Sequence, residues 1–107
     1  MSEPNTAANV EGDRVLAARA RVPDYVVYRE FVNETVVLNL RTGRYHGVNR
    51  TGARMLDVLQ KSETVADAAE QLAGEYGRPV SEIESDLGAF CTALADRGLI
   101  ELVDADG

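Results

Sequence analysis

The chain has 107 residues, the size of one domain, and 45% of them are hydrophobic, which is enough for a packed core. Its net charge of −7 argues against non-specific binding to nucleic acid or to an anionic membrane, because an acidic protein gains nothing from counterion release there. The single cysteine, the lack of an apolar run of membrane-spanning length and the lack of a basic or apolar signal region at the start predict a cytoplasmic protein without an intramolecular disulfide.

The first part of the chain is predicted to be a flexible arm. Residues 1–12 are polar and rich in small side chains. Residues 13–22 mix alanines with arginines, so a short helix can form there before Pro23 stops it. We therefore divide the chain into an N-terminal arm (1–24), a domain (25–103) and a tail (104–107).

Three β-rich segments open the predicted domain. Residues 25–32 and 35–40 are rich in aromatic and branched side chains, and the Asn33-Glu34 pair between them is a candidate two-residue turn. A second tight turn is expected at residues 41–43, where Gly43 can adopt a positive φ at no steric cost. Residues 44–48 then return as a third strand. The pattern predicts a three-stranded antiparallel meander whose short last strand has one neighbour.

The second half of the chain changes to helical periodicity. Asn49 is a suitable N-cap for a first helix that carries Met55 and Leu59 on its apolar face. A second helix is expected from Thr64, which begins a capping-box-like Thr-Val-Ala-Asp sequence, to Gly77. Its apolar residues fall at i, i+3, i+4 and i+7, the spacing of an amphipathic helix.

A third helix is predicted to begin in another capping box at Ser81–Glu84 and to end at Gly98. A short turn joins the last two helices, as in a helix-turn-helix, and residues 99–103 can add a short strand. The expected fold class is therefore α+β: a winged helix-turn-helix-like domain with a three-stranded antiparallel sheet followed by three helices.

The residue inventory argues against catalysis. His46 is the only histidine and lies in the third strand. Cys91 falls on the apolar face of the last helix, where a free cysteine behaves as a small hydrophobic residue. No cysteine or histidine cluster has zinc spacing, and no glycine-rich segment has the form of a phosphate-binding loop. We predict no catalytic residue, no cofactor and no metal.

Winged-helix domains often bind DNA, so a DNA-binding transcriptional regulator is one alternative. The helix over residues 81–97 opposes it, because its only base is Arg97 while its acids are Glu82, Glu84, Asp86 and Asp96. These carboxylates would approach phosphate in the major groove. Another alternative is a non-catalytic dimerisation module in which the free strand edge pairs with itself. A monomer or a weak homodimer fits the sequence.

One stretch of the chain is basic. Residues 35–56 contain no acid but four arginines, namely Arg41, Arg44, Arg50 and Arg54. These arginines are either ordinary solvated side chains on the surface, or they form an electropositive rim beside the third strand that would suit an acidic peptide.

An ordered set of residues runs through positions 25–102: a strand pair around a Thr-Gly turn, a Thr-Val helix start, an acidic last helix and a closing Gly-Leu-Ile. Its members are Leu38, Thr42, Gly43, Tyr45, Val48, Asn49, Thr51, Gly52, Thr64, Val65, Leu72, Tyr76, Asp86, Leu87, Phe90, Leu94, Gly98, Leu99 and Ile100. This set resembles the PqqD-like family, also described as precursor-peptide recognition elements. The chain departs from the family pattern in lacking a bulky aromatic residue near Leu56.

The resemblance implies a domain that binds the leader segment of a ribosomally synthesised precursor peptide and presents it to a modifying enzyme or a leader protease, in a lasso-peptide-type or related pathway. The leader would lie as an added antiparallel strand along the third strand, in the cleft against the third helix. A short edge strand with free main-chain groups is a template for such addition. Gly47 has no side chain to obstruct the approaching backbone.

The resemblance also indicates which residues bind the peptide. From the third strand we expect main-chain contacts of Arg44, Tyr45, His46 and Gly47. From the third helix we expect Ile83, Asp86, Leu87 and Phe90. Leu87 and Phe90 are also expected in the core. Asp86 borders the apolar face and can accept a hydrogen bond from the leader.

Overall fold

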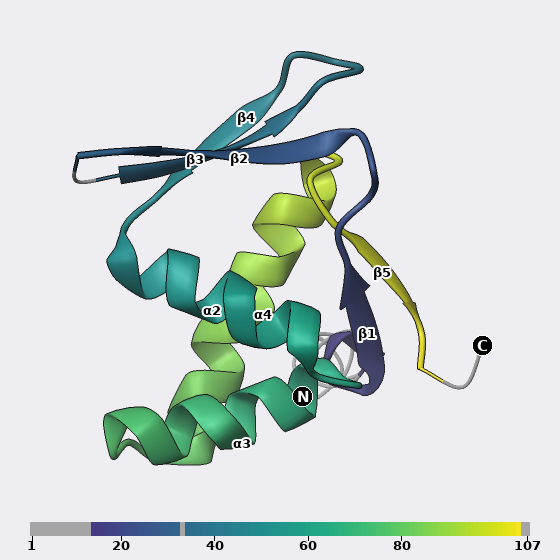
Figure 1. Ribbon diagram of the computed structural model, residues 1–107. Helices are drawn as coiled ribbons and strands as arrows, with labels where there is room; N and C mark the ends of the chain where they lie inside the picture. The colour runs from purple at the N-terminus through teal and green to yellow at the C-terminus, as the bar shows by residue number, and fades with distance from the viewer. Residues whose placement is uncertain (1–13, 33, 106–107) are drawn as a thin grey trace, which may run out of the picture.

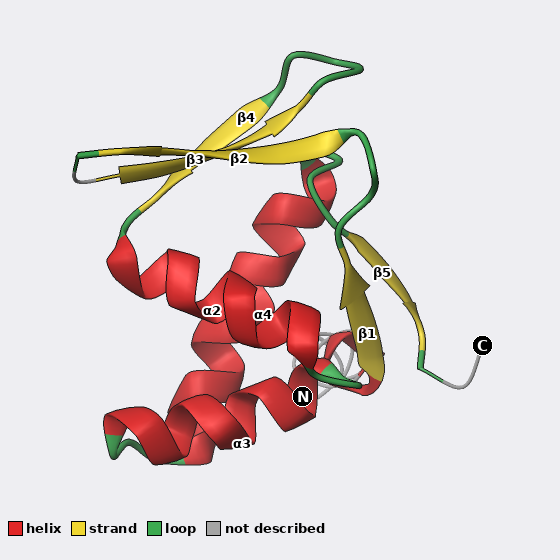
Figure 2. Cartoon of the chain, viewed as in Figure 1, coloured by secondary structure: helices red, strands yellow, loops and turns green. Residues whose placement is uncertain are grey.

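The structure is a computed structural model that describes residues 14–32 and 34–105. A three-stranded antiparallel sheet lies on one side of the molecule with the helices beneath it (Figures 1 and 2). Its strands, in the order β2-β3-β4, are β2 (Val26–Phe31), β3 (Glu34–Asn39) and β4 (Tyr45–Val48). The predicted meander is confirmed, and Gly43 adopts a φ of +77° in the turn before β4. Of the candidate turn at Asn33-Glu34, Asn33 lies outside the described residues and Glu34 begins β3.

The sheet has one face toward the helices and one toward solvent. Val37 and Val48 are 0% and 4% exposed and face the helices. Tyr45, by contrast, is 64% exposed. Because successive side chains of a strand alternate between faces, Val36 and Leu38 share the outer face with Tyr45. The inner face, which carries Val37 and Val48, packs β4 against the helices.

Three helices follow the sheet, as predicted: α2 (Arg50–Lys61), α3 (Val65–Tyr76) and α4 (Val80–Asp96). The side chain of Asn49 accepts a hydrogen bond from the Gly52 N–H, and that of Thr64 accepts one from the Asp67 N–H, so both predicted caps are confirmed. The capping box predicted at Ser81–Glu84 is wrong. α4 begins earlier, after Pro79, whose φ of −58° already suits the start of a helix and which makes no side-chain capping bond.

A second, two-stranded sheet was not predicted. β1 (Ala18–Arg21) pairs in antiparallel register with β5 (Glu101–Asp104) beside the helices (Figure 1). The prediction of a flexible arm with a short helix is therefore wrong for this segment, although residues 14–17 are helical and residues 1–13 lie outside the described part. Alanine and arginine favour helix locally, but pairing with β5 and burial of Ala20, 5% exposed, override that preference.

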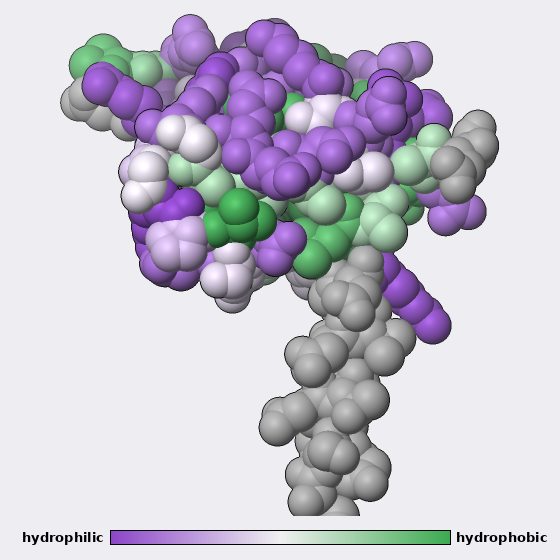
Figure 3. Space-filling view, turned by 90° about the horizontal axis from the view of Figure 1, so that it is seen from below, coloured by the Kyte–Doolittle hydropathy of each residue, from purple (hydrophilic) through white to green (hydrophobic). Residues whose placement is uncertain are grey.

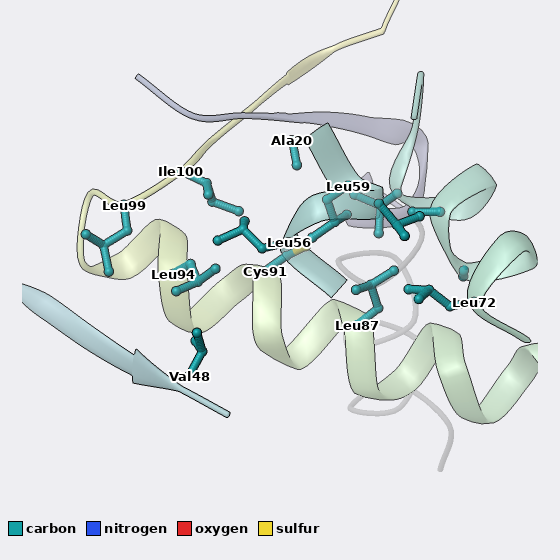
Figure 4. Close-up of a cluster of buried hydrophobic side chains, with 14 of the residues drawn as sticks. Ala20, Val48, Leu56, Leu59, Leu72, Leu87, Cys91, Leu94, Leu99 and Ile100 are labelled. Carbon is teal, nitrogen blue, oxygen red and sulfur yellow. The ribbon is translucent and has the colours of Figure 1, made fainter. Parts of the chain in front are cut away.

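The core joins the sheet to the helices through α4. Leu87, Cys91 and Leu94 lie along one side of α4, and each is 0% exposed. Figure 4 shows them beside Leu56 of α2, while Val48 points from β4 toward α4. A shared core of this kind fixes the position of β4 relative to α4.

The face on which α3 lies is largely hydrophilic (Figure 3). This agrees with the acidic and polar residues that alternate with the buried positions of α3. None of the helices in the described ranges combines the length and the apolar composition of a membrane span.

The first turn of α2 lies very close to the end of β4. A Cβ atom on Gly52 would lie 3.0 Å from the Cβ of Val48, which belongs to a rigid strand position. We therefore expect Gly52→Ala to lower the free energy of unfolding by about 1–2 kcal/mol, because overpacking outweighs the gain in helix propensity.

Gly74 provides the matched control for this substitution. It lies in α3, and no atom lies within 4 Å of the position of its missing Cβ. Gly74→Ala should therefore raise the free energy of unfolding by about 0.5–1 kcal/mol. Urea denaturation measures both variants, and equal stabilisation by the two would show that the contact between α2 and β4 is not tight.

Candidate functional site

The free edge of β4 carries main-chain groups with which another strand can pair. In an antiparallel pair, hydrogen-bonded and non-hydrogen-bonded residues alternate. The Asn39 N–H donates to the Arg44 carbonyl oxygen at 2.9 Å, so the next residue of β4 that bonds to β3 is His46. The N–H and C=O groups of Tyr45 and Gly47 therefore point away from β3. No turn, loop or cap hydrogen bond between described residues reaches them.

The opposite edge of the sheet, formed by β2, is partly closed. The register of β2 against β3 directs the main-chain groups of Val26 and Tyr28 outward. The Val26 N–H donates to the Pro23 carbonyl oxygen at 3.0 Å, and the Tyr28 carbonyl oxygen accepts from the Arg29 guanidinium at 3.0 Å. These two groups already have partners, so β4 offers the more open edge for a guest strand.

A pocket of about 340 Å³ opens beside the free edge of β4. It is bounded by the end of β4, the first turns of α2 and the middle of α4, which contribute His46, Gly47, Val48, Gly52, Met55, Asp86 and Phe90 among others. The His46 ring meets the Phe90 ring edge-on, with centroids 6.4 Å apart and planes at 72°. The pocket thus has a mixed lining, in which the apolar side chains of Val48, Met55 and Phe90 lie beside the Asp86 carboxylate and the His46 imidazole.

Asn39 holds the β3–β4 hairpin against the end of α4. Its side chain is 3% exposed, and its Nδ2 donates to the Gly98 carbonyl oxygen at 2.9 Å. Its Oδ1 accepts from the N–H groups of Arg41 at 2.9 Å and Thr42 at 3.1 Å, which fixes the turn. One buried side chain therefore fixes both the hairpin turn and the distance between β4 and α4.

Four of the predicted site residues meet at the pocket: His46, Gly47, Asp86 and Phe90. Ile83 and Leu87 do not, because they pack in the core, at 1% and 0% exposed. Helical spacing places them on the apolar face of α4, but this part of the face is covered by other helices.

The residues of β4 differ in whether their main-chain groups are free for the predicted contacts with a guest strand. Tyr45 and Gly47 present their main-chain groups outward, whereas those of His46 pair with β3, so His46 reaches the pocket through its side chain. Arg44 is occupied within the fold: its N–H donates to the Thr42 hydroxyl at 3.1 Å, and its guanidinium donates to the Asp96 carbonyl oxygen at 3.2 Å. These groups of Arg44 thus already have partners in the free protein, and its role in peptide binding stays a prediction.

Of the two alternatives for the basic stretch, the contacts of three of its arginines favour ordinary surface charge over an electropositive rim beside β4. Arg54 is bound by the carboxylates of Glu75 and Asp57. Arg41 lies over the ring of Tyr25, with its guanidinium carbon 3.9 Å from the ring centroid. Arg44 lies against the end of α4. The arginines share a stretch of sequence, but their partners distribute them over different surfaces.

A glycine at position 47 also leaves room for a neighbouring side chain of the sheet. A Cβ atom there would lie 2.5 Å from Oε1 of Glu34, on the outer face of the sheet. The missing side chain therefore leaves room for the Glu34 carboxylate on that face, while its effect on a guest backbone stays a prediction.

Several residues of the site were not predicted from the sequence. Met55 and Gly52 line the pocket from α2, and Asn39 positions the hairpin. The apolar spacing of α2 was a signal for Met55. The small residues that follow Asn49 in the sequence were a signal for Gly52. The bond of Asn39 to Gly98 could not be predicted, because the two residues lie 59 positions apart, whereas its bonds to Arg41 and Thr42 are a local turn pattern.

The titratable groups near the pocket are few. Burial raises the pKa of the Cys91 thiol to about 12, so the thiolate that nucleophilic chemistry requires is disfavoured. Within the described ranges, no three histidine, cysteine or acidic side chains come together as a metal site. The arrangement offers a strand edge beside a pocket with both apolar and polar side chains, which together suit an extended peptide.

Comparison with known proteins agrees with this geometry. Residues 34–100 match the family model of coenzyme PQQ synthesis protein D, PqqD. Two solved structures are similar: TbiB1 in complex with the TbiA(β) leader peptide, at 31% identity and a TM-score of 0.67 over 76% of this chain and 94% of that one, and a lasso peptide synthetase B1 complexed with the leader peptide, at 28% identity and a TM-score of 0.67 over 78% of this chain and 99% of that one. No curated protein matches the chain. The chain belongs to the PqqD family.

Proposed function

We propose that this chain binds the leader segment of a ribosomally synthesised precursor peptide and presents it to a modifying enzyme or a leader protease of a lasso-peptide-type pathway, without catalysing a reaction itself. The leader pairs as an antiparallel strand with the free edge of β4 and places side chains in the pocket against α4. The observation that carries the proposal is the open edge at Tyr45 and Gly47 beside the pocket that Met55 and Phe90 line, while β2 at the other edge of the sheet is partly closed. The leader complexes of the two similar structures support it.

Magnitudes indicate where the affinity arises. Four to six main-chain hydrogen bonds at ~1 kcal/mol each contribute about 5 kcal/mol. Ordering a flexible leader costs ~2–5 kcal/mol, which nearly cancels them. Two or three leader side chains buried in apolar surroundings, each contributing ~1.5–3 kcal/mol, must supply the remainder. The expected dissociation constant is micromolar or lower, with the pocket deciding which leader binds.

Titration of the ¹⁵N-labelled protein with the leader segment of the precursor encoded beside its gene tests this proposal. We expect the largest amide shifts at Tyr45, Gly47 and Asn49 and at Asp86 to Phe90. Shifts confined to α3 and the turn before α4 would contradict strand addition at β4. Analytical ultracentrifugation with and without the leader separates leader capture from self-pairing of the strand edge. A dimer that pairs through β4 should dissociate when leader is added.

Phe90 is expected to contribute strongly to leader affinity, because its half-buried ring lines the pocket. Phe90→Ala should weaken leader binding by about 2–3 kcal/mol, which is about 30- to 150-fold in the dissociation constant. Isothermal titration calorimetry measures the loss.

Phe31 is the matched control for Phe90→Ala. It is 65% exposed at the end of β2 and does not line the pocket beside β4. Phe31→Ala should leave leader affinity within about twofold of the parent, since a solvated side chain contributes little to either state. Equal losses in the two variants would place the leader elsewhere on the protein.

A further inference from the structure

The outer face of the sheet has a gap at Gly47, and an acidic group occupies it. Glu34 begins β3, and its Oε1 lies 2.5 Å from the point where a Cβ of Gly47 would be. The carboxylate thus lies over the backbone of the edge strand, next to the N–H and C=O groups that point outward. Any residue larger than glycine at position 47 would displace it.

A guest strand paired with β4 would direct alternate side chains to the two faces of the sheet. Residues directly opposite each other across an antiparallel pair lie on the same face, with Cβ atoms about 4.5–5.5 Å apart. The guest residue opposite His46 therefore faces α4, because His46 contacts Phe90. The guest residue opposite Gly47 faces outward, on the side of the Glu34 carboxylate.

The Glu34 carboxylate makes no ion pair with another residue of the described chain. Arg29 shares the outer face, but its guanidinium donates to the Tyr28 carbonyl oxygen at the far edge of the sheet. Arg50 lines the same hollow as Glu34 without an approach of 4.0 Å or less. The negative charge beside the edge strand is therefore left for a guest.

Resting on the proposed function, we propose that Glu34 selects a lysine or an arginine at the guest position opposite Gly47. Glycine makes this contact possible, because no side chain from β4 separates the guest residue from the carboxylate. The guest residues before and after the basic one face inward, opposite Val48 and His46. An antiparallel guest therefore carries an apolar residue for the Val48–Met55 side of the pocket, then the basic residue, then the residue opposite His46.

Selection of random linear peptides displayed on phage tests this inference and requires no leader sequence. Peptides are selected against the parent, Glu34→Gln and Glu34→Lys, and circular dichroism checks that each variant is folded. We expect a single position enriched in lysine or arginine with the parent, no enrichment with Glu34→Gln, and aspartate or glutamate at that position with Glu34→Lys. For one parent-selected peptide, Glu34→Gln should weaken binding about two- to fivefold, and the difference should shrink in high salt.

Glu30→Gln is the matched control, because Glu30 lies in the same hairpin but pairs with Thr35 on the inner face. It should keep the parent's basic preference. If the selected peptides fail to bind Tyr45→Pro but show no basic preference with the parent, the role of Glu34 is overturned and strand addition at β4 still stands. Peptides that bind Tyr45→Pro as well as the parent would overturn strand addition at β4 and this inference with it.

Discussion

Replacing Tyr45 with proline should abolish leader binding while the domain remains folded. The Tyr45 N–H points out of the sheet, so its removal breaks no bond between β3 and β4. Proline is tolerated at such positions of an edge strand. The guest carbonyl that would accept from this N–H is left without a donor and meets the proline ring instead. An unsatisfied group of this kind costs about 1–3 kcal/mol, and the steric clash adds to it, so affinity should fall at least about 100-fold.

Two further substitutions separate the main-chain effect from other causes. Tyr45→Ala retains the N–H and should bind leader within about fivefold of the parent, because the Tyr45 side chain is 64% exposed on the outer face. His46→Pro removes an N–H that bonds to β3 and should destabilise the hairpin itself.

Fluorescence anisotropy with labelled leader measures affinity, and thermal denaturation confirms folding. Strong leader binding by a folded Tyr45→Pro variant would exclude the β4 edge as the docking strand. Loss of binding in Tyr45→Ala to the same extent as in Tyr45→Pro would instead assign the affinity to the Tyr45 side chain.

Most parts of the fold that depend on neighbouring residues could be predicted from the sequence, with the capping box at Ser81–Glu84 as the exception. The turn at Gly43 and the caps at Asn49 and Thr64 are local features, and each is found where expected. The sheet between them follows from strand-like segments joined by short turns. Local chemistry of this kind is sufficient because a turn or a cap is satisfied by residues within a few positions.

The features that depend on distant partners could not be predicted. β1 resembles a helix in isolation and becomes a strand only because β5, at the other end of the chain, pairs with it. Arg54 looks free in the sequence, but Glu75 of another helix binds it. The spacing of Ile83 and Leu87 identifies an apolar face without showing which part of that face other helices cover. In each case a contact made by folding decides the outcome.

The same reasoning applies to the candidate site. The family resemblance indicated which strand and helix bind the peptide, and four of the residues expected from it, namely His46, Gly47, Asp86 and Phe90, line the pocket. The direction of the main-chain groups of Tyr45 and Gly47 required the register of β3 against β4. A shift of one position would turn the groups of His46 outward and place the Tyr45 side chain toward α4. Residues that fix the register are therefore as important for binding as residues that line the pocket.

Asn39 is the residue for which this claim is most easily tested. Asn39→Ala should lower the free energy of unfolding by about 2–3 kcal/mol, because it leaves the Gly98 carbonyl oxygen and two turn N–H groups without their partner. It should also weaken leader binding under conditions in which the protein remains folded, since the hairpin is no longer held against α4. Urea denaturation and leader titration measure the two effects. Asn49→Ala, which removes one capping bond, should cost only about 1 kcal/mol.

Asn39→Asp separates the two bonds of this side chain. The introduced carboxyl can still accept from Arg41 and Thr42 but, when ionised, cannot donate to the Gly98 carbonyl oxygen. The N–H groups of Arg41 and Thr42 lower the pKa of this carboxyl, but we expect burial and the facing Gly98 carbonyl to outweigh them and to raise the pKa in the folded state above its unfolded value of about 3.9. Relative to the parent, the variant should therefore be most stable below about pH 4, where the protonated group can donate, and should lose stability as the pH rises through the folded pKa. If leader affinity follows the same pH dependence, the bond between Asn39 and Gly98 sets the width of the cleft. Lost stability with unchanged affinity would limit Asn39 to a role in folding.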